Sequence, residues 1–267
     1  MSLPVMLTFD MDAENLWTAR DPKGKGKPVW VSQGTYGPEV GLPRILSLLS
    51  RYDLPATFFV PGEVIENHPV AVESILERGH VVEHHSYTHT WSDELDESAE
   101  REEFQKGWDA IVSATGRKPK GWRSPAGELT ENTITLMEEF GFSYSSNLFD
   151  SDTAHWLTDR GRVTDIVELP FAWVLDDAPF FLYSNRLPGR TMAAPSAVVE
   201  SWIAEFEGLR TEPGTHMLIG MHPQVIGRHS RLTVLEQTVR HILESGDGEF
   251  IACEDYAARI RESNTGR

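Results

Sequence analysis

Two acidic residues stand directly after an apolar run near the N-terminus. Asp10 follows the run VMLTF (residues 5–9), and Asp12 comes two positions later. If the extended geometry of that run continues, period-2 alternation points both carboxylates to the same side. Two anionic carboxylates this close repel each other, so one of them is normally stabilised by a metal ion or an arginine. The pair alone is equally compatible with a functional site and with plain acids at a strand end.

Three histidines, His84, His85 and His89, cluster after the run HVVE. The i, i+4 spacing of His85 and His89 predicts that their imidazoles share one helical turn. Two neutral imidazoles and one carboxylate suit Zn²⁺, Fe²⁺, Co²⁺ or Ni²⁺ and leave positions open for water and substrate. A lone histidine is usually a satisfied polar group, but this clustering favours a site. His84 is expected to face the core.

Two further side chains, Arg123 and His222, are of kinds that take part in proton transfer. Arg123 lies in WRSPAG, and an arginine beside Asp10 would favour the ionised carboxylate. Taken alone, a turn with a solvent-facing arginine is the commoner interpretation. His222 follows the apolar run LIGM, and an imidazole there could donate a proton to a leaving nitrogen. His216, at the opposite end of that run, is expected to be structural.

These groups stand at the ends of predicted strands, which alternate with predicted helices. Strands are predicted at 5–9, 56–60, 80–84, 121–123, 142–147, 165–171, 216–221 and 249–253. Helices are predicted at 39–52, 70–78, 97–115, 131–140, 196–209 and 231–245, with a final helix after 253. This alternation predicts an α/β fold in a single domain, residues 1–267, with a parallel sheet wrapped by helices. With about seven strands, a closed or nearly closed barrel is favoured over a doubly wound sheet, and its active site is expected at the carboxyl ends of the strands.

Two stretches lack a clear period. Residues 20–28 (RDPKGKGKP) are rich in Gly, Pro and Lys and predict a mobile loop, with a lid over the site as the minority interpretation. Residues 147–164 predict a long loop, and long loops in compact domains are often functional.

Composition limits the classes of partner. The formal charge is −17, which disfavours nucleic acid and membrane surfaces as partners. The single cysteine, Cys253, excludes an intrachain disulfide and fits a reducing compartment. The N-terminus shows no signal-peptide pattern, and no apolar run approaches the ~18 residues that cross a bilayer. We therefore expect a soluble, cytoplasmic protein.

The order of these motifs resembles the polysaccharide deacetylase family, and the resemblance runs from about residue 5 to residue 255. The family's T-F-D-D-G corresponds to TFDMDAE, its H-S-x-x-H to His85, Ser86 and His89, its R-x-P-x-G to RSPAG (123–127), and its L-x-x-H to the segment ending at His222. The resemblance implies a distorted (β/α) barrel of about seven strands. It also implies one divalent metal, zinc first and Co, Ni, Fe or Mn as alternatives, held by Asp12, His85 and His89.

The same resemblance implies roles for the remaining groups. Asp10 would be the base, oriented by Arg123, and His222 the acid that protonates the leaving nitrogen. The metal would polarise the substrate carbonyl and lower the pKa of water. A backbone N–H near Tyr36 or Tyr87 is expected to hold the oxyanion. Further side chains expected at the substrate are Glu14, Trp17, Tyr36, Tyr87, Trp91, Pro125 and Asp150.

Two departures from the family pattern matter. The D-x-D-A-E segment and HPQVIGR (222–228) are similar to a subgroup with cyclic imidases, allantoinase-like enzymes and intracellular peptidoglycan deacetylase-like proteins. Members of this subgroup are often homotetramers, so a tetramer or dimer is expected. The family's D-x-W element, which supports the acid histidine, has no clean counterpart, and the candidates are Asp150, Asp152 and Trp156.

Three functions remain open from the sequence. The preferred one is a hydrolase of small cyclic amides or imides, because no export signal accompanies the strongly acidic composition. The second is an N-deacetylase of acetylated sugars, on whose rings the tryptophans could stack. The third is an inactive barrel that binds a carbohydrate or metabolite, and it is least favoured because base, ligands, arginine and acid are all present.

Overall fold

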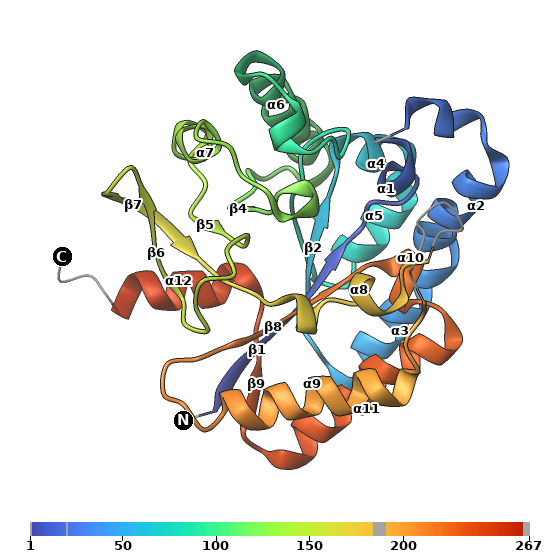
Figure 1. Ribbon diagram of the computed structural model, residues 1–267, viewed down its shortest axis with the longest axis vertical. Coiled ribbons are helices and arrows are strands. Elements are labelled where there is room, and N and C mark those ends of the chain that lie inside the picture. Colours follow the sequence, from blue (N-terminus) through green and yellow to red (C-terminus); the bar gives the residue numbers. More distant parts are fainter. Residues whose placement is uncertain (1, 20, 184–190, 264–267) are drawn as a thin grey trace.

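The computed structural model describes residues 2–19, 21–183 and 191–263, and one curled sheet runs through them (Figure 1). Its strands are β1 (Leu3–Asp10), β2 (Thr57–Val60), β3 (Val81–His84), β4 (Gly121–Trp122), β5 (Tyr144–Ser145), β6 (His155–Asp159), β7 (Arg162–Glu168), β8 (Met217–Met221) and β9 (Gly248–Phe250). A parallel series runs in the order β7-β5-β4-β3-β2-β1-β8. Strand β6 pairs antiparallel with β7, and β9 pairs parallel with the start of β1.

The edges of this parallel series, β7 and β8, approach each other through single bridges. Asp176 pairs in parallel with Gly220 of β8, and Thr153 pairs antiparallel with Thr215. The first bridge brings the chain after β7 back to β8, and the second joins the residues before β6 to those before β8, so the sheet curls into an incompletely closed barrel. The expected distorted barrel of about seven parallel strands is confirmed. The strand order does not reverse as a doubly wound sheet requires.

Helices surround the strands in Figure 1. They are α1 (Asn15–Thr18), α2 (Pro28–Tyr36), α3 (Leu42–Tyr52), α4 (Gly62–Asn67), α5 (Pro69–Leu76), α6 (Glu97–Thr115), α7 (Thr133–Phe140), α8 (Ala178–Phe181), α9 (Pro195–Leu209), α10 (Pro223–Ile226), α11 (His229–Ser245) and α12 (Cys253–Ser263). The long predicted helices are all present, whereas α1, α2, α4, α8 and α10 were not predicted. In the described part of the chain, no helix has the length and apolarity needed to cross a bilayer.

Strand β1 shows how the sheet separates core from site. Leu7 and Phe9 belong to the large apolar cluster shared with the surrounding helices, whereas Met6 belongs to a second cluster formed with other strands. Alternation places Thr8 and Asp10 on the same side of the strand as Met6. Both strand faces are buried, as a strand in a parallel sheet wrapped by helices must be.

Both predicted loops contain regular structure. The prediction for 147–164 was wrong over β6, which forms a hairpin with β7 through Arg160 (φ 48°) and Gly161 (φ 82°). Two successive positive φ values match a type I′ hairpin turn. Residues 21–28 form a 3₁₀ turn (Pro22–Gly26) and the start of α2, and Lys25 contacts Glu63 at 2.9 Å. Residue 20 lies outside the described residues, and a lid role for this segment stays a prediction.

Candidate metal and catalytic centre

Four strands deliver the predicted functional side chains to one rim of the barrel. Asp10 ends β1, and His85, Arg123 and His222 directly follow β3, β4 and β8. All four are buried, and so is Asp12. The carboxyl ends of parallel strands share one edge of a barrel, so residues far apart in the chain meet there.

Asp12, His85 and His89 form a compact set of potential metal ligands. Asp12 Oδ1 lies 3.3 Å from His85 Nε2 and 3.5 Å from His89 Nε2. One ligand atom from each residue falls within 4.8 Å of the others. Both Asp12 oxygens are buried without a hydrogen-bond donor, which is costly for a carboxylate. A divalent ion between these three atoms would satisfy them, so the donor set fits the implied metal.

The contact behind His85 prepares it for this role. Its Nδ1 lies 2.8 Å from the carbonyl oxygen of Arg123, and an N–H donated there leaves the Nε2 lone pair facing Asp12. Such an outer contact commonly fixes the tautomer of a metal-binding histidine. Burial would raise the pKa of Asp12, but the imidazoles of His89, His85 and His222 lower it to about 2. Burial lowers the pKa of His89 to about 4, so this set is one anion with at least one neutral imidazole at pH 7.

The predicted helical turn between His85 and His89 was wrong. The segment after β3 is a loop in which Ser86 and His89 have positive φ values of 64° and 66°. Glu103 of α6 replaces the helical hydrogen bonds, because its Oε2 accepts the N–H groups of Tyr87 and Thr88 at 2.9 and 2.7 Å. The same oxygen accepts the hydroxyl of Ser86 at 2.6 Å. Glu103 therefore positions the loop that carries both imidazoles.

Replacing Glu103 by alanine is expected to weaken metal binding by about 10- to 100-fold, a typical loss when an outer contact of a metal site is removed. The N–H groups of Tyr87 and Thr88 would lose their acceptor, and the loop would no longer hold His85 and His89 at the observed separation. Titration of the apo-protein with Zn²⁺ measures this. The neighbouring Glu102→Ala is the control, because Glu102 is exposed and pairs only with Lys106 in this region. Equal affinities for both variants would refute the positioning role.

His84, as expected, faces the core. Its Nε2 lies 3.0 Å from the carbonyl oxygen of Phe104, and its ring stacks on Phe104 at 5.4 Å between centroids. A side chain at Gly107 would come within 2.6 Å of its Nε2, so the glycine permits helix α6 to pack this closely. His216 is likewise buried and contacts the carbonyl oxygen of Pro170 at 2.8 Å.

Arg123 holds Asp10 from inside the barrel. One of its terminal nitrogens, Nη1, donates to Asp10 Oδ1 at 2.8 Å and to Thr8 Oγ1 at 2.9 Å, and its Nη2 donates to Ser146 Oγ at 2.9 Å. The Phe59 ring lies 4.2 Å from the guanidinium carbon. Arg123 is therefore buried and paired, which excludes the solvent-facing interpretation. Asp10 Oδ2 accepts no hydrogen bond from the described residues.

His222 is supported by Asp177, which is not among the three residues predicted for this role. His222 Nδ1 lies 2.7 Å from Asp177 Oδ1, and the backbone N–H of His222 donates to Asp177 Oδ2 at 3.1 Å. Its Nε2 faces the metal ligands, 3.7 Å from Asp12 Oδ2. Asp176, bridged to Gly220 of β8, lies 4.0 Å from His222 Nδ1.

The three predicted supports for His222 were therefore wrong. Asp150 is exposed and lies near His155, 3.6 Å away. Asp152 accepts the His216 N–H through its backbone carbonyl, and Trp156 lies on β6 beneath the guanidinium of Arg261. A signal for the true support did exist. The segment AWVLDDAP (172–179) places two acids after an apolar run, as residues 5–12 do, but no predicted strand marked it as part of the rim.

The backbone N–H groups of Tyr36 and Tyr87 themselves are already donated, and an oxyanion donor near them stays a prediction. The Tyr87 N–H is donated to Glu103, and Tyr36 is the last residue of α2, where its N–H belongs to the helical ladder. Their hydroxyls are also engaged, that of Tyr36 by Arg44 at 2.6 Å and that of Tyr87 with Glu66 at 2.9 Å. The other side chains expected at the substrate, which are Glu14, Trp17, Trp91, Pro125 and Asp150, range from buried to exposed.

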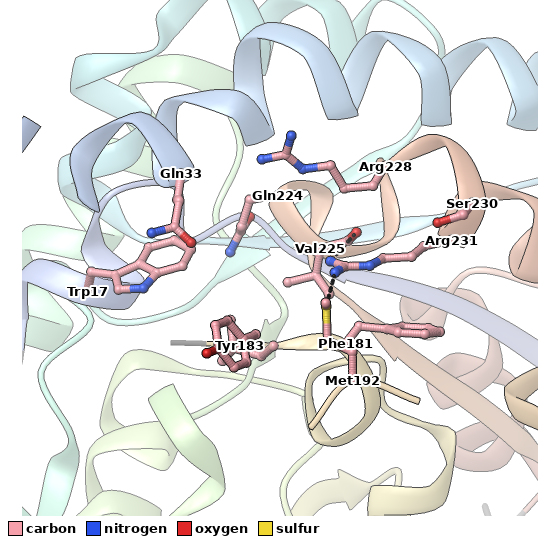
Figure 2. Close-up of a pocket in the computed structure, with 11 residues that line it drawn as sticks. Trp17, Gln33, Phe181, Tyr183, Met192, Gln224, Val225, Arg228, Ser230 and Arg231 are labelled. Atoms are coloured by element: carbon pink, nitrogen blue, oxygen red, sulfur yellow. Dashed lines mark hydrogen bonds between the residues drawn. The ribbon is translucent and has the colours of Figure 1, made fainter. Parts of the chain in front are cut away.

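Glu14 Oε2 is held by His68 at 2.9 Å, and Pro125 is buried in the 3₁₀ turn Pro125–Gly127. Trp91 is half-buried just before the 3₁₀ turn Ser92–Glu94, and Asp150 has the exposed position described above. Trp17 lines a pocket of about 330 Å³, shown in Figure 2 together with Gln224, which follows His222 by two positions. Contact of these side chains with substrate stays a prediction.

Known proteins are similar to this chain in sequence and in fold. A family model described as polysaccharide deacetylase matches residues 24–145. The peptidoglycan deacetylase of Helicobacter pylori is 29% identical over 257 residues, which cover 87% of each chain. A Mycobacterium smegmatis protein, whose crystal structure is assigned to the polysaccharide deacetylases, is 33% identical. Its TM-score is 0.92, and the match covers 97% of this chain and 90% of that one.

A further solved structure, that of Puue allantoinase, has a TM-score of 0.81 at 21% identity, over 99% of this chain and 92% of that one, and thus shares the fold. The Mycobacterium smegmatis match combines high identity with nearly full coverage of both chains. With the family model and the Helicobacter pylori relative, it places the chain among hydrolases that act on C–N bonds. The chain therefore belongs to the polysaccharide deacetylase family.

Proposed function

We propose that this protein is a metal-dependent hydrolase of non-peptide amide C–N bonds. The observation that carries the proposal is the buried Asp12 carboxylate, whose two oxygens lack donors while the Nε2 atoms of His85 and His89 face it at 3.3 and 3.5 Å. A second acid, Asp10, stands beside this set and is held by Arg123. One imidazole, His222, completes the group. Zinc is the preferred ion because two imidazoles and one carboxylate are a common catalytic zinc set.

The side chains divide the proton transfers between them. The metal, when bound, would act as a Lewis acid toward the amide carbonyl and lower the pKa of water. Asp10 is anchored through Oδ1 by Arg123, so its Oδ2 is the atom that takes the proton from the attacking water. His222, oriented through Nδ1 by Asp177, presents Nε2 to the departing nitrogen and gives it a proton. Neither Asp10 nor His222 has to move for these proton transfers, because a buried partner fixes each side chain.

The acid role of His222 predicts a defined pH dependence. Burial lowers the pKa of His222, but the Asp177 and Asp176 carboxylates raise it well above its usual range. A raised pKa keeps the imidazolium at neutral pH, and activity is lost as the pH rises through that value. Asp177→Asn removes a charge that raises the pKa and leaves burial in place, so the alkaline limb of kcat/KM should move down by about one unit or more.

The pH profile of kcat/KM, measured for wild type and Asp177→Asn with the same metal content, checks this expectation. Asp109→Asn is the control, because its carboxylate is exposed on α6 and accepts only from Gln105 among the described residues. An unshifted alkaline limb in Asp177→Asn would show that His222 does not supply the proton.

A small cyclic amide or imide is the preferred substrate. The reacting groups lie deep, with Asp10 and His222 exposed by only 8% and 9%. The adjoining pocket of about 330 Å³ is at the small end of the range for ligand sites. The similarity of fold to Puue allantoinase supports a cyclic substrate, because that enzyme's name denotes hydrolysis of one.

An N-acetylated sugar is the second candidate, and one surface feature favours it. Phe149 and Trp173 are 45% and 49% exposed and stack with ring centroids 5.0 Å apart. They lie over Gly127 of the arginine motif, and Phe171 connects them to Arg123. Flat exposed rings beside a site suit sugar stacking, and the Helicobacter pylori relative is a peptidoglycan deacetylase.

A substrate panel separates the candidates. The metal-loaded protein should hydrolyse at least one of hydantoin, dihydrouracil, succinimide and allantoin faster than it deacetylates chitooligosaccharides. Turnover confined to the sugars, and reduced by Trp173→Ala, would replace the preferred function by the second. No turnover of any amide by the loaded protein would favour an inactive binding barrel.

A further inference from the structure

The pocket of about 330 Å³ has a positively charged lining, which is unusual for so acidic a chain. Figure 2 shows Arg228 and Arg231 directed into it, together with Gln224 and Trp17. Neither guanidinium contacts a carboxylate of the described residues. Arg228 stacks on the Tyr36 ring at 3.4 Å, and Arg231 donates to the Val225 carbonyl oxygen at 3.4 Å and contacts Met192 Sδ at 3.0 Å. In a chain of net charge −17, two cations are thus kept together without a salt bridge to a described carboxylate, although the charge of Asp177 acts on Arg231 from outside contact distance.

The position of these cations in α11 is electrostatically unfavourable. Arg228 is the residue before α11, Arg231 lies in its first turn, and that turn contains no acidic residue. The N-terminus of a helix carries partial positive charge from its unpaired N–H groups, where acids rather than bases are stabilising. Burial lowers the pKa of Arg231, the Asp177 carboxylate opposes that shift, and the nearby Arg228 lowers the pKa again. An anion in the pocket would offset both the repulsion between the two guanidinium groups and their unfavourable position at the helix N-terminus.

Gln224 gives an independent indication that a polar ligand is missing. It is only 4% exposed, and neither its Nε2 nor its Oε1 has a hydrogen-bond partner. Its side chain points into the pocket between Trp17 and Arg231 (Figure 2). A buried amide with both ends unpaired is rare in folded proteins and normally indicates a group that binds there.

Residues that line the pocket are close in sequence to the catalytic groups. Gln224 follows the acid His222 by two positions, and Phe181 and Tyr183 on the opposite wall follow the supporting Asp177 by four and six. The same two segments therefore build the pocket wall and position the acid.

We propose that this pocket binds an anionic oxygen group, carboxylate or phosphate, carried by the substrate, through Arg228, Arg231 and Gln224. This rests on the proposed function, because it names the substrate class of the same site: a small amide with a negatively charged substituent. A planar guanidinium pairs with two oxygens of such a group at once, and Gln224 supplies a further donor. The aromatic side chains Trp17 and Tyr183 then contact the body of the molecule.

Binding of two anions to the metal-loaded protein tests this without any turnover. Succinate and inorganic phosphate are titrated by calorimetry into wild type, Arg228→Gln, Arg231→Gln and the double variant, with succinamide as the uncharged counterpart of succinate. We expect one of the two anions to bind, succinamide to bind at least about tenfold more weakly, and the double variant to lose about tenfold or more in affinity. Which anion binds distinguishes a carboxylate from a phosphate substituent.

Arg240→Gln is the matched control, because Arg240 lies on the same helix and pairs with Glu244 at the surface. Metal content and melting temperature of each variant show whether the centre and the fold are intact. Anion binding that is unchanged in the folded, metal-loaded double variant would place the anion on the metal and overturn the proposal, as would failure of both anions to bind. Amide turnover with no anion binding would contradict this inference and leave the proposed function intact. Arginine-dependent anion binding without amide turnover would contradict only the proposed function.

Discussion

Replacing His85 and His89 together by alanine is expected to abolish both metal binding and amide hydrolysis. The three potential ligand atoms lie within 4.8 Å of one another, and the double change leaves Asp12 as the only ligand. One buried carboxylate cannot hold a divalent ion against buffer at micromolar metal, since catalytic zinc sites use three protein ligands. Each single change should lower the affinity strongly, and the double change should leave no measurable rate. Elemental analysis of the purified variants and turnover of the best substrate measure the two losses.

The histidine His241 offers the matched control, because it pairs with Glu207 on the outer surface. His241→Ala should keep the metal and the rate. The double variant should remain folded by circular dichroism, since removal of two imidazoles from a polar set leaves the apolar clusters intact. A folded double variant with a full complement of metal would show that the ligands have been assigned wrongly.

Replacing Asp10 by asparagine is expected to separate rate from metal binding. The amide oxygen of asparagine can still accept from Arg123 Nη1, so the geometry of the buried pair is kept. The other terminal atom becomes an amide nitrogen, which cannot take a proton from water. Loss of a general base typically costs 10²- to 10⁴-fold, and we expect a decrease of about that size in kcat. Single-turnover kinetics with metal content determined on the same sample measure it.

Two outcomes would contradict the role of Asp10. An unchanged rate would show that another group accepts the proton. Loss of the metal together with the rate would make Asp10 a ligand rather than a base. The conservative Asp10→Glu adds a useful comparison, because it keeps the carboxylate but displaces it relative to Arg123, and partial activity is expected.

The sequence allowed much of this centre to be predicted, because local rules place its residues. Apolar runs that end in Asp10, His85 or His222 indicate buried strands, and parallel strands end at one edge of a barrel. The period-2 rule predicted Asp10 and Asp12 on one side of the chain, and both carboxylates lie near enough to His85 to raise its pKa. The strongest predictions therefore concern residues whose position depends on their own strand.

Contacts between distant segments could not be predicted in the same way. Asp177 reaches His222 only because the chain after β7 returns to β8 through the Asp176–Gly220 bridge. The loop from His85 to His89 has helical spacing, but Glu103 of α6 accepts its N–H groups and holds a different backbone. In both cases a buried carboxylate from another segment decides the local geometry, and no sequence period records that.

The missed strand β6 has a different cause. Its residues His155–Asp159 are mostly half-buried at the sheet edge, so they lack the apolar run that marked the inner strands. The hairpin signal lay instead in the turn at Arg160 and Gly161. Edge strands that are exposed on one side are the least distinct in composition.

X-ray absorption spectroscopy at the zinc edge of the loaded protein tests the central claim most directly. If Asp12, His85 and His89 hold the ion, the spectrum should show two imidazole ligands at about 2.0–2.1 Å, with oxygen in the remaining positions and no sulfur. The His89→Ala protein, loaded at high zinc, should show one imidazole fewer. A spectrum without imidazole, or one identical in wild type and His89→Ala, would contradict the metal centre described above.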